Sequence, residues 1–414
     1  MGFNELGLHE RIVKALEELK YSEPTEVQQQ VIPHVLAGDD VLAGAQTGTG
    51  KTAAFVLPIV NRLLEQARDE NTSVKLSALI LAPTRELALQ VFKSVQAYSQ
   101  NTYVKSSIVY GGVSIGAQVD ELKKGVDVLV ATPGRLIDHL FKGTVDVSQI
   151  QTLVFDEADR MLDMGFMDEI KMILKRLPKV RQTLLFSATL DDAIFKLSQS
   201  LLNSPKIIEV HGRNSVAAPV EQVVYNIDSD RKREFISYLI GSKNWQQVLV
   251  FTRTKQGADA LAKEMKKDGL VAESIHGDKS QGARERALDD FKQGKARVLV
   301  ATDVAARGLD IRQLKYVVNY ELPYIAEDYI HRIGRTGRAG ESGLAISLLA
   351  PEEAYLLEEI EAILDTRLNQ QWFPGFEPDF TKTPSTDKKN SKSAQKRRAK
   401  QRAMGPSTGN KRRR

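Results

Sequence analysis

A glycine-rich segment that ends in lysine and threonine is the clearest chemical signal in this 414-residue chain. It fits the phosphate-binding spacing GxxxxGK[ST], with alanine in the place of the first glycine. Its residues are Ala45, Gln46, Thr47, Gly48, Thr49, Gly50, Lys51 and Thr52. Glycines let backbone N–H groups turn toward phosphate oxygens, and the start of the following helix adds positive potential. We predict that Lys51 reaches the outer phosphates of a nucleotide and that the Thr52 hydroxyl joins Mg²⁺.

Two alternatives to this phosphate loop can be weighed. A dinucleotide-binding GxGxxG loop is excluded, because no third glycine follows Gly48 and Gly50 at the right offset. A simple glycine-rich turn with a surface lysine is the other alternative. The apolar run before the loop and the helix-length segment after it favour the phosphate loop.

Three acidic residues, Asp156, Glu157 and Asp159, follow the apolar run at 152–155. In open α/β sheets, ligands bind at the carboxyl ends of the strands, so these acids would face the phosphate loop. Asp156 would hold Mg²⁺, largely through water, and Glu157 would polarise the attacking water. A short acidic run alone is more often a solvated helix start. The phosphate loop upstream reverses that preference.

Three arginines at a spacing of three, Arg332, Arg335 and Arg338, form a second basic signal. Residues 329–340 contain no acidic residue that could pair with them, which points to a polyanionic ligand. The segment lies in the opposite half of the chain from the phosphate loop. An arginine finger delivered across a cleft would make hydrolysis depend on domain closure. The alternative is an RNA-backbone patch with no catalytic role.

Short apolar runs must form the strands that position these groups. They occur at 40–46, 76–84, 126–133, 152–159 and 183–189, and again at 247–252, 296–303, 316–323 and 343–350. They do not alternate apolar with polar residues, which is typical of parallel strands covered by helices on both faces. Helix-length segments lie between them. The pattern predicts an α/β fold of doubly wound parallel sheets.

The division of the chain follows from its composition. We predict a first domain over 1–208, a polar linker over 209–221, a second domain over 222–372, and a final segment over 373–414. That segment begins with aromatic residues and proline and continues as a basic tail with almost no apolar content. Such a tail cannot bury enough surface to offset its ordering entropy, so we expect it to be disordered.

Charge and cysteine content narrow the class of protein. The chain has a net charge of +5, but the tail at 381–414 alone carries 13 Lys/Arg and one Asp, which leaves −7 for the rest. A polyanion site in the folded part must therefore be a local cluster. The absence of cysteine excludes disulfides and thiol nucleophiles and suits a reducing cytosol. With no signal-peptide pattern and no apolar stretch near the roughly 20 residues of a membrane span, we expect a cytoplasmic protein without membrane contact.

Together these motifs resemble the DEAD-box RNA helicases. AQTGTGKT, PTRELA, TPGR, DEAD, SAT, ATDVAARGLD and HRIGRTGR occur in the order typical of that family, between residues 3 and 372. The family's own phosphate loop begins with alanine, as Ala45 does here. The stretch DEADRMLDMGFMDEI and the basic tail are similar to the bacterial RhlE-type subgroup. The resemblance implies two tandem RecA-like domains, with ATP and Mg²⁺ as cofactors.

The resemblance also implies further residues around ATP. Residues 21–28 look like the family's Q motif, within an N-terminal segment 1–29. Gln28 would select adenine, because an amide can accept from N6 and donate to N7 together. Phe3 and Tyr21 would supply apolar surface near the base. Asp310 would approach the nucleotide from the second domain, where Arg335 and Arg338 would be arginine fingers, and the residues that couple ATP to RNA would be Asp159, Ser187, Thr189 and His331.

RNA contacts are implied on loops that follow strands. In the first half they are Pro83, Thr84, Arg85, Gly111, Gly112, Thr132, Pro133, Gly134 and Arg135; in the second half they are Arg253, Thr254, Gln281, Arg284, Thr302 and Arg307. Glycine allows close backbone approach, threonine and N–H groups bind phosphate oxygens, and arginine adds charge. None reads base edges, so RNA would be told from DNA by its 2′-OH. Each residue taken singly could equally be a turn or a helix cap.

Three functions use such a set of residues. The leading one is an ATP-dependent RNA helicase that separates short duplexes locally or remodels RNA–protein complexes. An ATP-gated RNA clamp or assembly scaffold would need the same residues. A DNA translocase is disfavoured by the Q motif and the DEAD tetrad. The expected partner is RNA with little sequence preference, the resemblance suggests ribosomal precursors or the mRNA-decay machinery, and we expect a monomer.

Overall fold

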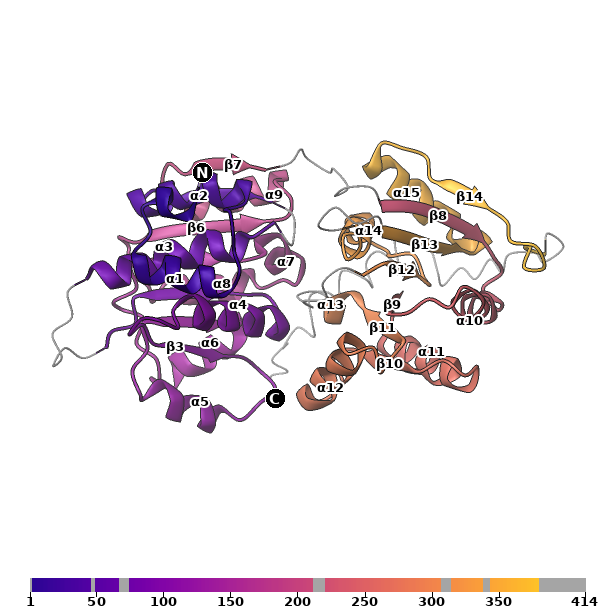
Figure 1. Ribbon diagram of the computed structural model, residues 1–414, viewed down its shortest axis with the longest axis horizontal. Coiled ribbons are helices and arrows are strands. Elements are labelled where there is room, and N and C mark those ends of the chain that lie inside the picture. Colours follow the sequence, from indigo (N-terminus) through magenta and orange to yellow (C-terminus); the bar gives the residue numbers. More distant parts are fainter. Residues whose placement is uncertain are drawn as a thin grey trace, which may run out of the picture. The chain divides into compact units, whose positions relative to one another are not determined.

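The computed structural model describes residues 2–45, 49–66, 74–210, 220–306, 314–337 and 343–379. The chain forms two compact units that divide between Arg213 and Asn214 (Figure 1). Each unit contains one parallel sheet of seven strands with helices on both faces. The predicted fold class of two doubly wound parallel sheets is therefore confirmed. The basic tail at 381–414 lies outside the described residues.

The first unit begins with η1 (Phe3–Leu6), α1 (Glu10–Glu18) and α2 (Glu26–Ala37). Its strands are β1 (Val41–Gly44), β2 (Ala78–Leu81), β3 (Ser106–Val109), β4 (Val128–Ala131), β5 (Thr152–Phe155), β6 (Gln182–Ser187) and β7 (Lys206–Glu209). The helices between them are α3 (Lys51–Glu65), α4 (Arg85–Tyr98), α5 (Ile115–Leu122), α6 (Pro133–Phe141), α7 (Ala158–Asp163), α8 (Met167–Leu174) and α9 (Asp192–Leu201). The strand order is β3-β4-β2-β5-β6-β1-β7.

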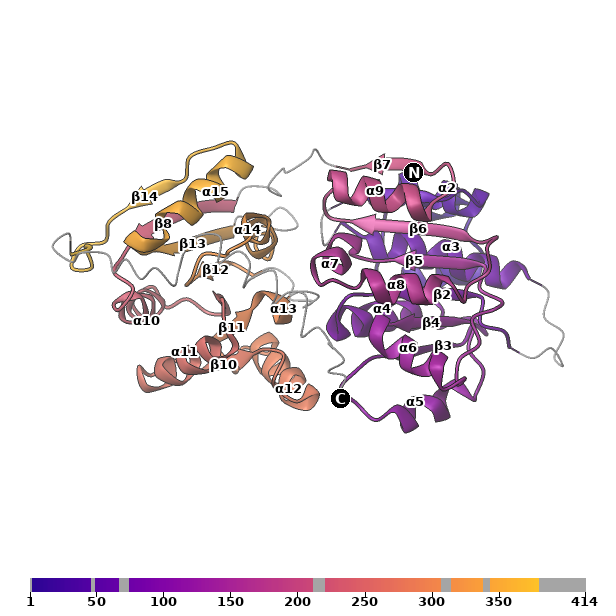
Figure 2. The same cartoon turned by 180° about the vertical axis from the view of Figure 1, so that it is seen from behind.

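Both faces of the first sheet are buried, which explains why its strands read as continuous apolar runs. Val41 and Ala43 of β1 enter a core shared with α1 to α4, whereas Leu42 enters a core shared with α6 to α9. Helices of the first group lie in front of the sheet in Figure 1. Those of the second group are seen from behind in Figure 2.

The second unit repeats the arrangement with its own elements. Its strands are β8 (Val220–Asn226), β9 (Val248–Thr252), β10 (Ala272–Ile275), β11 (Val298–Thr302), β12 (Tyr316–Asn319), β13 (Gly343–Leu349) and β14 (Asn369–Gln371). Its helices are α10 (Lys232–Ser242), α11 (Lys255–Lys267), α12 (Gln281–Lys292), α13 (Asp303–Ala306), α14 (Ala326–Ile333), η2 (Pro351–Glu353) and α15 (Ala354–Leu364). The strand order is β10-β11-β9-β12-β13-β8-β14. If β8 is numbered as the first strand of this unit, the strand order is the same as in the first sheet. The two halves nevertheless show no sequence repeat.

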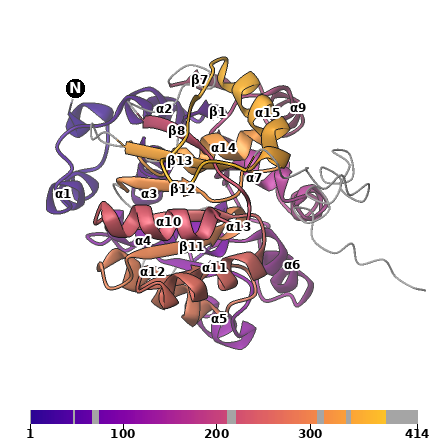
Figure 3. The same ribbon diagram turned by 90° about the vertical axis from the view of Figure 1, so that its right-hand side faces the viewer.

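In the second unit, one face of the sheet is covered by fewer helices than either face of the sheet in the first unit. α10 and α11 pack on that face, where they can be followed in Figure 3, while α12 to α15 pack on the other. Part of the remaining surface is covered by Phe373 and Phe376, whose ring centroids each lie 5.2 Å from that of Phe235. Arg231 Nη2 donates to the Gly375 carbonyl at 2.7 Å. The second unit thus extends beyond residue 372, the predicted end of the domain.

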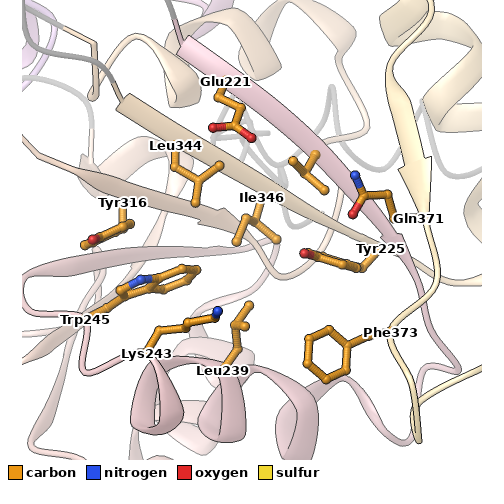
Figure 4. Close-up of a pocket in the computed structure, with 11 residues that line it drawn as sticks. Glu221, Tyr225, Leu239, Lys243, Trp245, Tyr316, Leu344, Ile346, Gln371 and Phe373 are labelled. Carbon is orange, nitrogen blue, oxygen red and sulfur yellow. The ribbon is translucent and has the colours of Figure 1, made fainter.

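A cavity of about 420 Å³ lies beside this aromatic cluster (Figure 4). Phe373 and Tyr225 line one side of it, and Trp245, stacked on Tyr316 with 4.4 Å between ring centroids, lines the other. Tyr316 and Leu344 stand at the amino ends of β12 and β13. The cavity is therefore remote from the carboxyl ends of those strands, where ligands bind in this class of fold.

The strands β7 and β8 extend into the predicted linker at 209–221. β7 ends at Glu209 and β8 begins at Val220. β7 is an edge strand with three exposed residues among four, so its composition is polar and resembles a linker in the sequence. Residues 211–219 lie outside the described part of the chain. In the described ranges, we find no helix with the length and apolarity needed to cross a bilayer.

The packing of Phe373 generates a stability prediction. We expect Phe373→Ala to lower the free energy of unfolding of the second unit by about 2–3 kcal/mol, since a partly buried aromatic ring is lost from the core. The neighbouring Trp372 is 62% exposed, so Trp372→Ala is the matched control and should change stability by less than about 0.5 kcal/mol. Both tryptophans of the chain, Trp245 and Trp372, lie in this unit, and denaturant unfolding followed by their fluorescence reports on it. Equal stability of the two variants would contradict the assignment.

Candidate active site

The order of the strands separates the predicted ATP residues from the predicted RNA residues. Parallel strands bring all their carboxyl ends to one edge of a sheet. In the first unit, the phosphate loop and the acidic residues follow β1 and β5, with Ser187 ending β6, and these three strands lie in the continuous order β5-β6-β1. The RNA candidates follow β2, β3 and β4, which form the adjoining order β3-β4-β2. Each set is therefore gathered by the fold from distant parts of the sequence.

In the described part of the phosphate loop, the last residues bond back to the first. Lys51 begins α3 and is buried, and its Nζ donates to the Ala45 carbonyl at 2.6 Å. Gly50 has a φ of 95°, a left-handed conformation that favours glycine. Thr52 lies half-buried in the first turn of α3. Gln46, Thr47 and Gly48 lie outside the described residues.

The Gln28 side chain holds this loop against α2. Its Nε2 donates to the Gly50 carbonyl at 3.1 Å, and its Oε1 accepts from the Thr25 N–H at 2.9 Å in a capping box. A Cβ at Gly50 would lie 2.3 Å from Gln28 Nε2, so the contact also requires glycine there. These two bonds leave the amide a second N–H and a second lone pair for the predicted contact with adenine.

The two predicted aromatic residues differ in their surroundings. Phe3 is 5% exposed and belongs to the core shared with α1 to α4. Tyr21 is 37% exposed, and its hydroxyl lies 3.3 Å from that of Tyr98. Tyr21 thus presents a surface to solvent, whereas the Phe3 ring is mainly a core residue in this structure. Leu6, which is also apolar and buried three residues later in η1, is the sequence signal for that burial.

Asp156 and Glu157 are buried at the carboxyl end of β5. Burial raises the pKa of Asp156 to about 7, against the opposing effect of the Lys51 ammonium. Glu157 has a φ of 55°, which is unusual for a non-glycine residue and costs about 1 kcal/mol. Within the described ranges its Oε2 is buried without a hydrogen-bond partner. A strained backbone and an unsatisfied carboxylate are typical of a functional position.

The last acid of the tetrad connects β5 to β6. Asp159 Oδ2 accepts from the Ala188 N–H at 3.2 Å, while its Oδ1 accepts from the Arg160 N–H at 3.0 Å. Thr189 N–H donates to Ser187 Oγ at 3.3 Å. Asp159 thus bonds to Ala188, the residue between Ser187 and Thr189, so three of the four residues predicted to couple ATP to RNA lie close together.

The predicted RNA residues of the first unit also contact one another. The Arg85 guanidinium lies against Gly112, where a Cβ would come within 2.1 Å of its Nη1. Arg135 Nη1 donates to the Val113 carbonyl at 3.0 Å. Thr84 caps α4 by accepting from the Leu87 N–H at 3.2 Å. Thr132 and Pro133 are buried at the start of α6, while a Cβ at Gly111 or Gly134 would meet no atom within 4 Å.

In the second unit, the structure gives Arg253 carboxylate partners. Its Nη2 lies 3.3 Å from Glu321 Oε1 and 2.5 Å from Glu353 Oε1, and its side chain is 17% exposed. Glu353 also pairs with the buried Lys232. Arg253 was predicted from the resemblance as an RNA contact; here it neutralises two acids that the sequence places far away.

The other RNA candidates of the second unit are mostly buried. Thr254 caps α11 by accepting from the Gly257 N–H at 2.9 Å. Gln281 Nε2 donates to Glu285 at 3.0 Å, while its Oε1 is buried with no partner among the described residues. Arg284 and Thr302 are buried as well. Arg307 and Asp310 lie outside the described ranges.

The interpretation of the arginine run as unpaired is wrong for Arg332. This residue is 1% exposed, and its Nε and Nη2 donate to the two carboxylate oxygens of Asp303 at 2.5 and 2.8 Å. This partner, Asp303, begins α13 and lies outside residues 329–340. Arg335 is buried at the end of α14, His331 is half-buried, and Arg338 lies outside the described residues.

The second sheet has no phosphate loop of its own. β8 takes the place of β1 in the strand order, but it is followed by Ile227, Asp228, Ser229 and Asp230 rather than by glycines and lysine. The geometry therefore provides one phosphate loop in the described chain. We also find no group of three His, Cys, Asp or Glu side chains placed to hold a metal, as far as the described ranges extend.

Known proteins are similar to both units of this chain in sequence and in structure. Residues 25–197 match the model of the DEAD/DEAH box helicases, and residues 231–340 match that of the helicase conserved C-terminal domain. The ATP-dependent RNA helicase CshA of Listeria monocytogenes is 43% identical over 91% of this chain and 72% of its own length. The DEAD-box ATP-dependent RNA helicase CshA of Geobacillus kaustophilus is 43% identical over 87% and 76%.

Among solved structures, that of S. cerevisiae Dbp5 bound to RNA and ADP BeF3 is 32% identical, with a TM-score of 0.78 over 90% of this chain and 95% of that one. The bacterial relatives carry the name CshA, so the predicted similarity to the RhlE-type subgroup finds no support in them.

The ion pairs of Arg253 generate a prediction that separates structure from RNA contact. We expect Arg253→Met to lower the free energy of unfolding of the second unit by about 3 kcal/mol, because two carboxylates lose their buried cation. Arg286→Met is the control, since that side chain is exposed on α12. Denaturant unfolding followed by tryptophan fluorescence is the measurement. Unchanged stability together with weaker RNA binding would return Arg253 to the role first predicted.

Proposed function

We propose, from the premise that this chain belongs to the DEAD-box family of ATP-dependent RNA helicases, that it hydrolyses ATP when RNA is bound. It uses this cycle to separate short RNA duplexes locally or to remodel RNA–protein complexes. One observation carries the proposal: the buried Lys51, the buried Asp156 and Glu157, whose Oε2 has no partner among the described residues, stand at the carboxyl ends of strands that the sheet brings together.

The chemistry of hydrolysis is assigned to these three side chains. Lys51 offers its ammonium to the outer phosphates, exchanging its bond to the Ala45 carbonyl. The Glu157 carboxylate has an oxygen without a protein donor, so it is free to accept a proton from an attacking water. Phosphoryl transfer needs mainly positioning and charge stabilisation, and a buried cation next to buried acids supplies both.

A magnesium ion fits the same residues. Asp156 is a fully buried carboxyl whose pKa is raised by desolvation, and a nearby cation would offset that penalty. Thr52 and Asp156 would hold the ion, largely through water. When bound, Mg²⁺ would neutralise charge on the transferred phosphate.

RNA is assigned to the loops after β2, β3 and β4, which we call the RNA face: residues 83–85, 111–112 and 132–135. Open backbone at Gly111 and Gly134 and the Arg85 guanidinium suit the phosphate backbone. Nothing in this set reads base edges in register, so affinity is sequence-independent, and 2′-OH contacts distinguish RNA from DNA. The second unit contributes Thr254, Gln281, Arg284, Thr302 and Arg307.

Hydrolysis depends on residues from the second unit. Arg335 and Arg338 act as arginine fingers, and Asp310 approaches the nucleotide. The residues that couple ATP to RNA are His331 of this unit and Asp159, Ser187 and Thr189 of the first unit. Gln28, with Tyr21 and the edge of Phe3, selects adenine. These roles rest on the family resemblance and on the placement of the first-unit residues at one sheet edge.

The wider setting belongs to the same proposal. A cytoplasmic location agrees with the absence of cysteine. A monomer that acts on ribosomal precursors or with the mRNA-decay machinery follows from the resemblance alone. For the subgroup, the CshA relatives offer a better guide than the RhlE type.

Two substitutions in the first unit test the assignment. Lys51→Ala and Glu157→Gln should each lower RNA-stimulated hydrolysis by at least about 100-fold, since each removes a group that acts on the transferred phosphate or the water. They should differ in binding. Lys51→Ala should weaken ATP affinity, whereas Glu157→Gln should bind ATP and stay on RNA. Steady-state ATPase rates and nucleotide titration are the measurements.

The matched controls are Lys93→Ala and Glu121→Gln, both at exposed helix positions of the first unit. They should hydrolyse ATP at the wild-type rate. A Glu157→Gln variant that hydrolyses ATP near the wild-type rate would show that this carboxylate does not act on the water.

A further inference from the structure

A buried amide lies behind the RNA face. Gln118 is 7% exposed on α5, a helix to which the family resemblance assigned no role. Its Nε2 donates to the Tyr110 carbonyl at 2.9 Å. Its Oε1 accepts from Arg135 Nη1 at 3.3 Å and lies 3.1 Å from His139 Nε2. One side chain therefore contacts the loop after β3 and the helix after β4.

The contacts define which way this amide points. A flipped amide would set the Gln118 NH₂ group against the Arg135 guanidinium, which can only donate, and would set its oxygen against a carbonyl oxygen. His139 is fully buried, and its Nδ1 lies 2.8 Å from Thr144 Oγ1. Because Gln118 Oε1 can only accept, the neutral imidazole carries its proton on Nε2 and donates it to Gln118, and Nδ1 accepts from the Thr144 hydroxyl, which also lies 3.2 Å from the His139 carbonyl. Each polar atom of the Gln118 amide therefore has a partner of the right kind, as a buried polar network requires.

The atoms held by Gln118 belong to the RNA face or adjoin it. Tyr110 directly precedes Gly111 and Gly112, and Gly112 is the glycine against which the Arg85 guanidinium lies. Gly112 has a φ of 85°, so this loop has a conformation that other residues rarely adopt. Arg135 also donates to the Val113 carbonyl at 3.0 Å on the far side of the same loop. The glycine loop is thus held on both sides, and with it the position of Arg85.

We propose that Gln118 is a positioning residue for RNA binding: it holds the Gly111–Gly112 loop in register with the Arg135 helix so that the three loops of the RNA face present one surface. This rests on the proposed function, which assigns those loops to RNA. A loop with two adjacent glycines loses much conformational entropy on ordering. The hydrogen bond from the Gln118 side chain to the Tyr110 carbonyl orders the loop before RNA binds. Preorganisation of this kind increases affinity without a contact to the ligand.

Two variants separate the loop contact from the helix contacts. Gln118→Glu keeps acceptor oxygens for Arg135 and His139 but loses the donor to the Tyr110 carbonyl. Gln118→Leu loses both. We expect each to raise the RNA concentration for half-maximal ATPase stimulation by about tenfold, the size of one hydrogen bond's contribution. The rate at saturating RNA and the KM for ATP should stay within about twofold of wild type, because the ATP residues lie at other strands.

Thermal unfolding distinguishes positioning from a general loss of structure. Thr144→Val removes the partner of His139 Nδ1 without touching Gln118, so it should lower the Tm and leave the RNA requirement unchanged. Gln118→Glu should raise the RNA requirement whatever its own effect on the Tm, because it removes the donor to the Tyr110 carbonyl. Gln96→Leu, at an exposed site on α4, is the surface control. The proposal is overturned if the RNA requirement follows the Tm across these variants, or if both Gln118 variants keep the wild-type requirement.

Arg85→Ala shows which proposal has failed. If this variant raises the RNA requirement while both Gln118 variants do not, the RNA face stands and the role of Gln118 is wrong. If Arg85→Ala leaves the requirement unchanged, or RNA does not stimulate the wild-type enzyme, the RNA face itself is wrong and the role of Gln118 falls with it.

Discussion

All strands of each sheet run in one direction, and the function of the molecule depends on this constraint. Parallel pairing brings every carboxyl end to one edge, where the chain turns into loops and helix N-termini. In the first unit, the residues proposed to bind ATP follow β5-β6-β1 and those proposed to bind RNA follow β3-β4-β2, and the two sets adjoin at the paired strands β2 and β5. A change at the acids can thus reach the RNA loops through neighbouring strands rather than through a long path.

The second unit has the same strand order but different chemistry at the same edge. After β8 it has Asp228 and Asp230 in place of a phosphate loop, while Arg253 after β9 and Asp303 after β11 each pair with an oppositely charged residue that follows β12. Arg332 and Arg253 are held by Asp303, Glu321 and Glu353. The Arg332–Asp303 pair joins the residues that directly follow His331 on α14 and Thr302 at the end of β11. The duplicated fold therefore has a phosphate loop at this edge of one sheet and arginine–carboxylate pairs at the same edge of the other.

Most interior strands could be predicted from the sequence, because burial on both faces leaves continuous apolar runs, and their parallel order brings the predicted first-unit residues to one edge of the sheet. All nine runs became strands, whereas β3, β7, β8, β10 and β14 were missed, since each carries polar residues or lies exposed at a sheet edge. Partners from distant segments were also missed: Asp303 for Arg332, and Gln118 for Arg135. Phe373 and Phe376 were placed outside the domain, because an aromatic segment shows its packing partner only in the fold.

The ATPase rate with single-stranded RNA, compared with single-stranded DNA of the same sequence and length, tests the central claim most directly. If the sheet edge couples a single phosphate loop to loops that recognise the 2′-OH, RNA should stimulate hydrolysis at saturation and DNA should leave it near the rate without nucleic acid. Equal stimulation by DNA, or hydrolysis that is independent of RNA, would contradict the account.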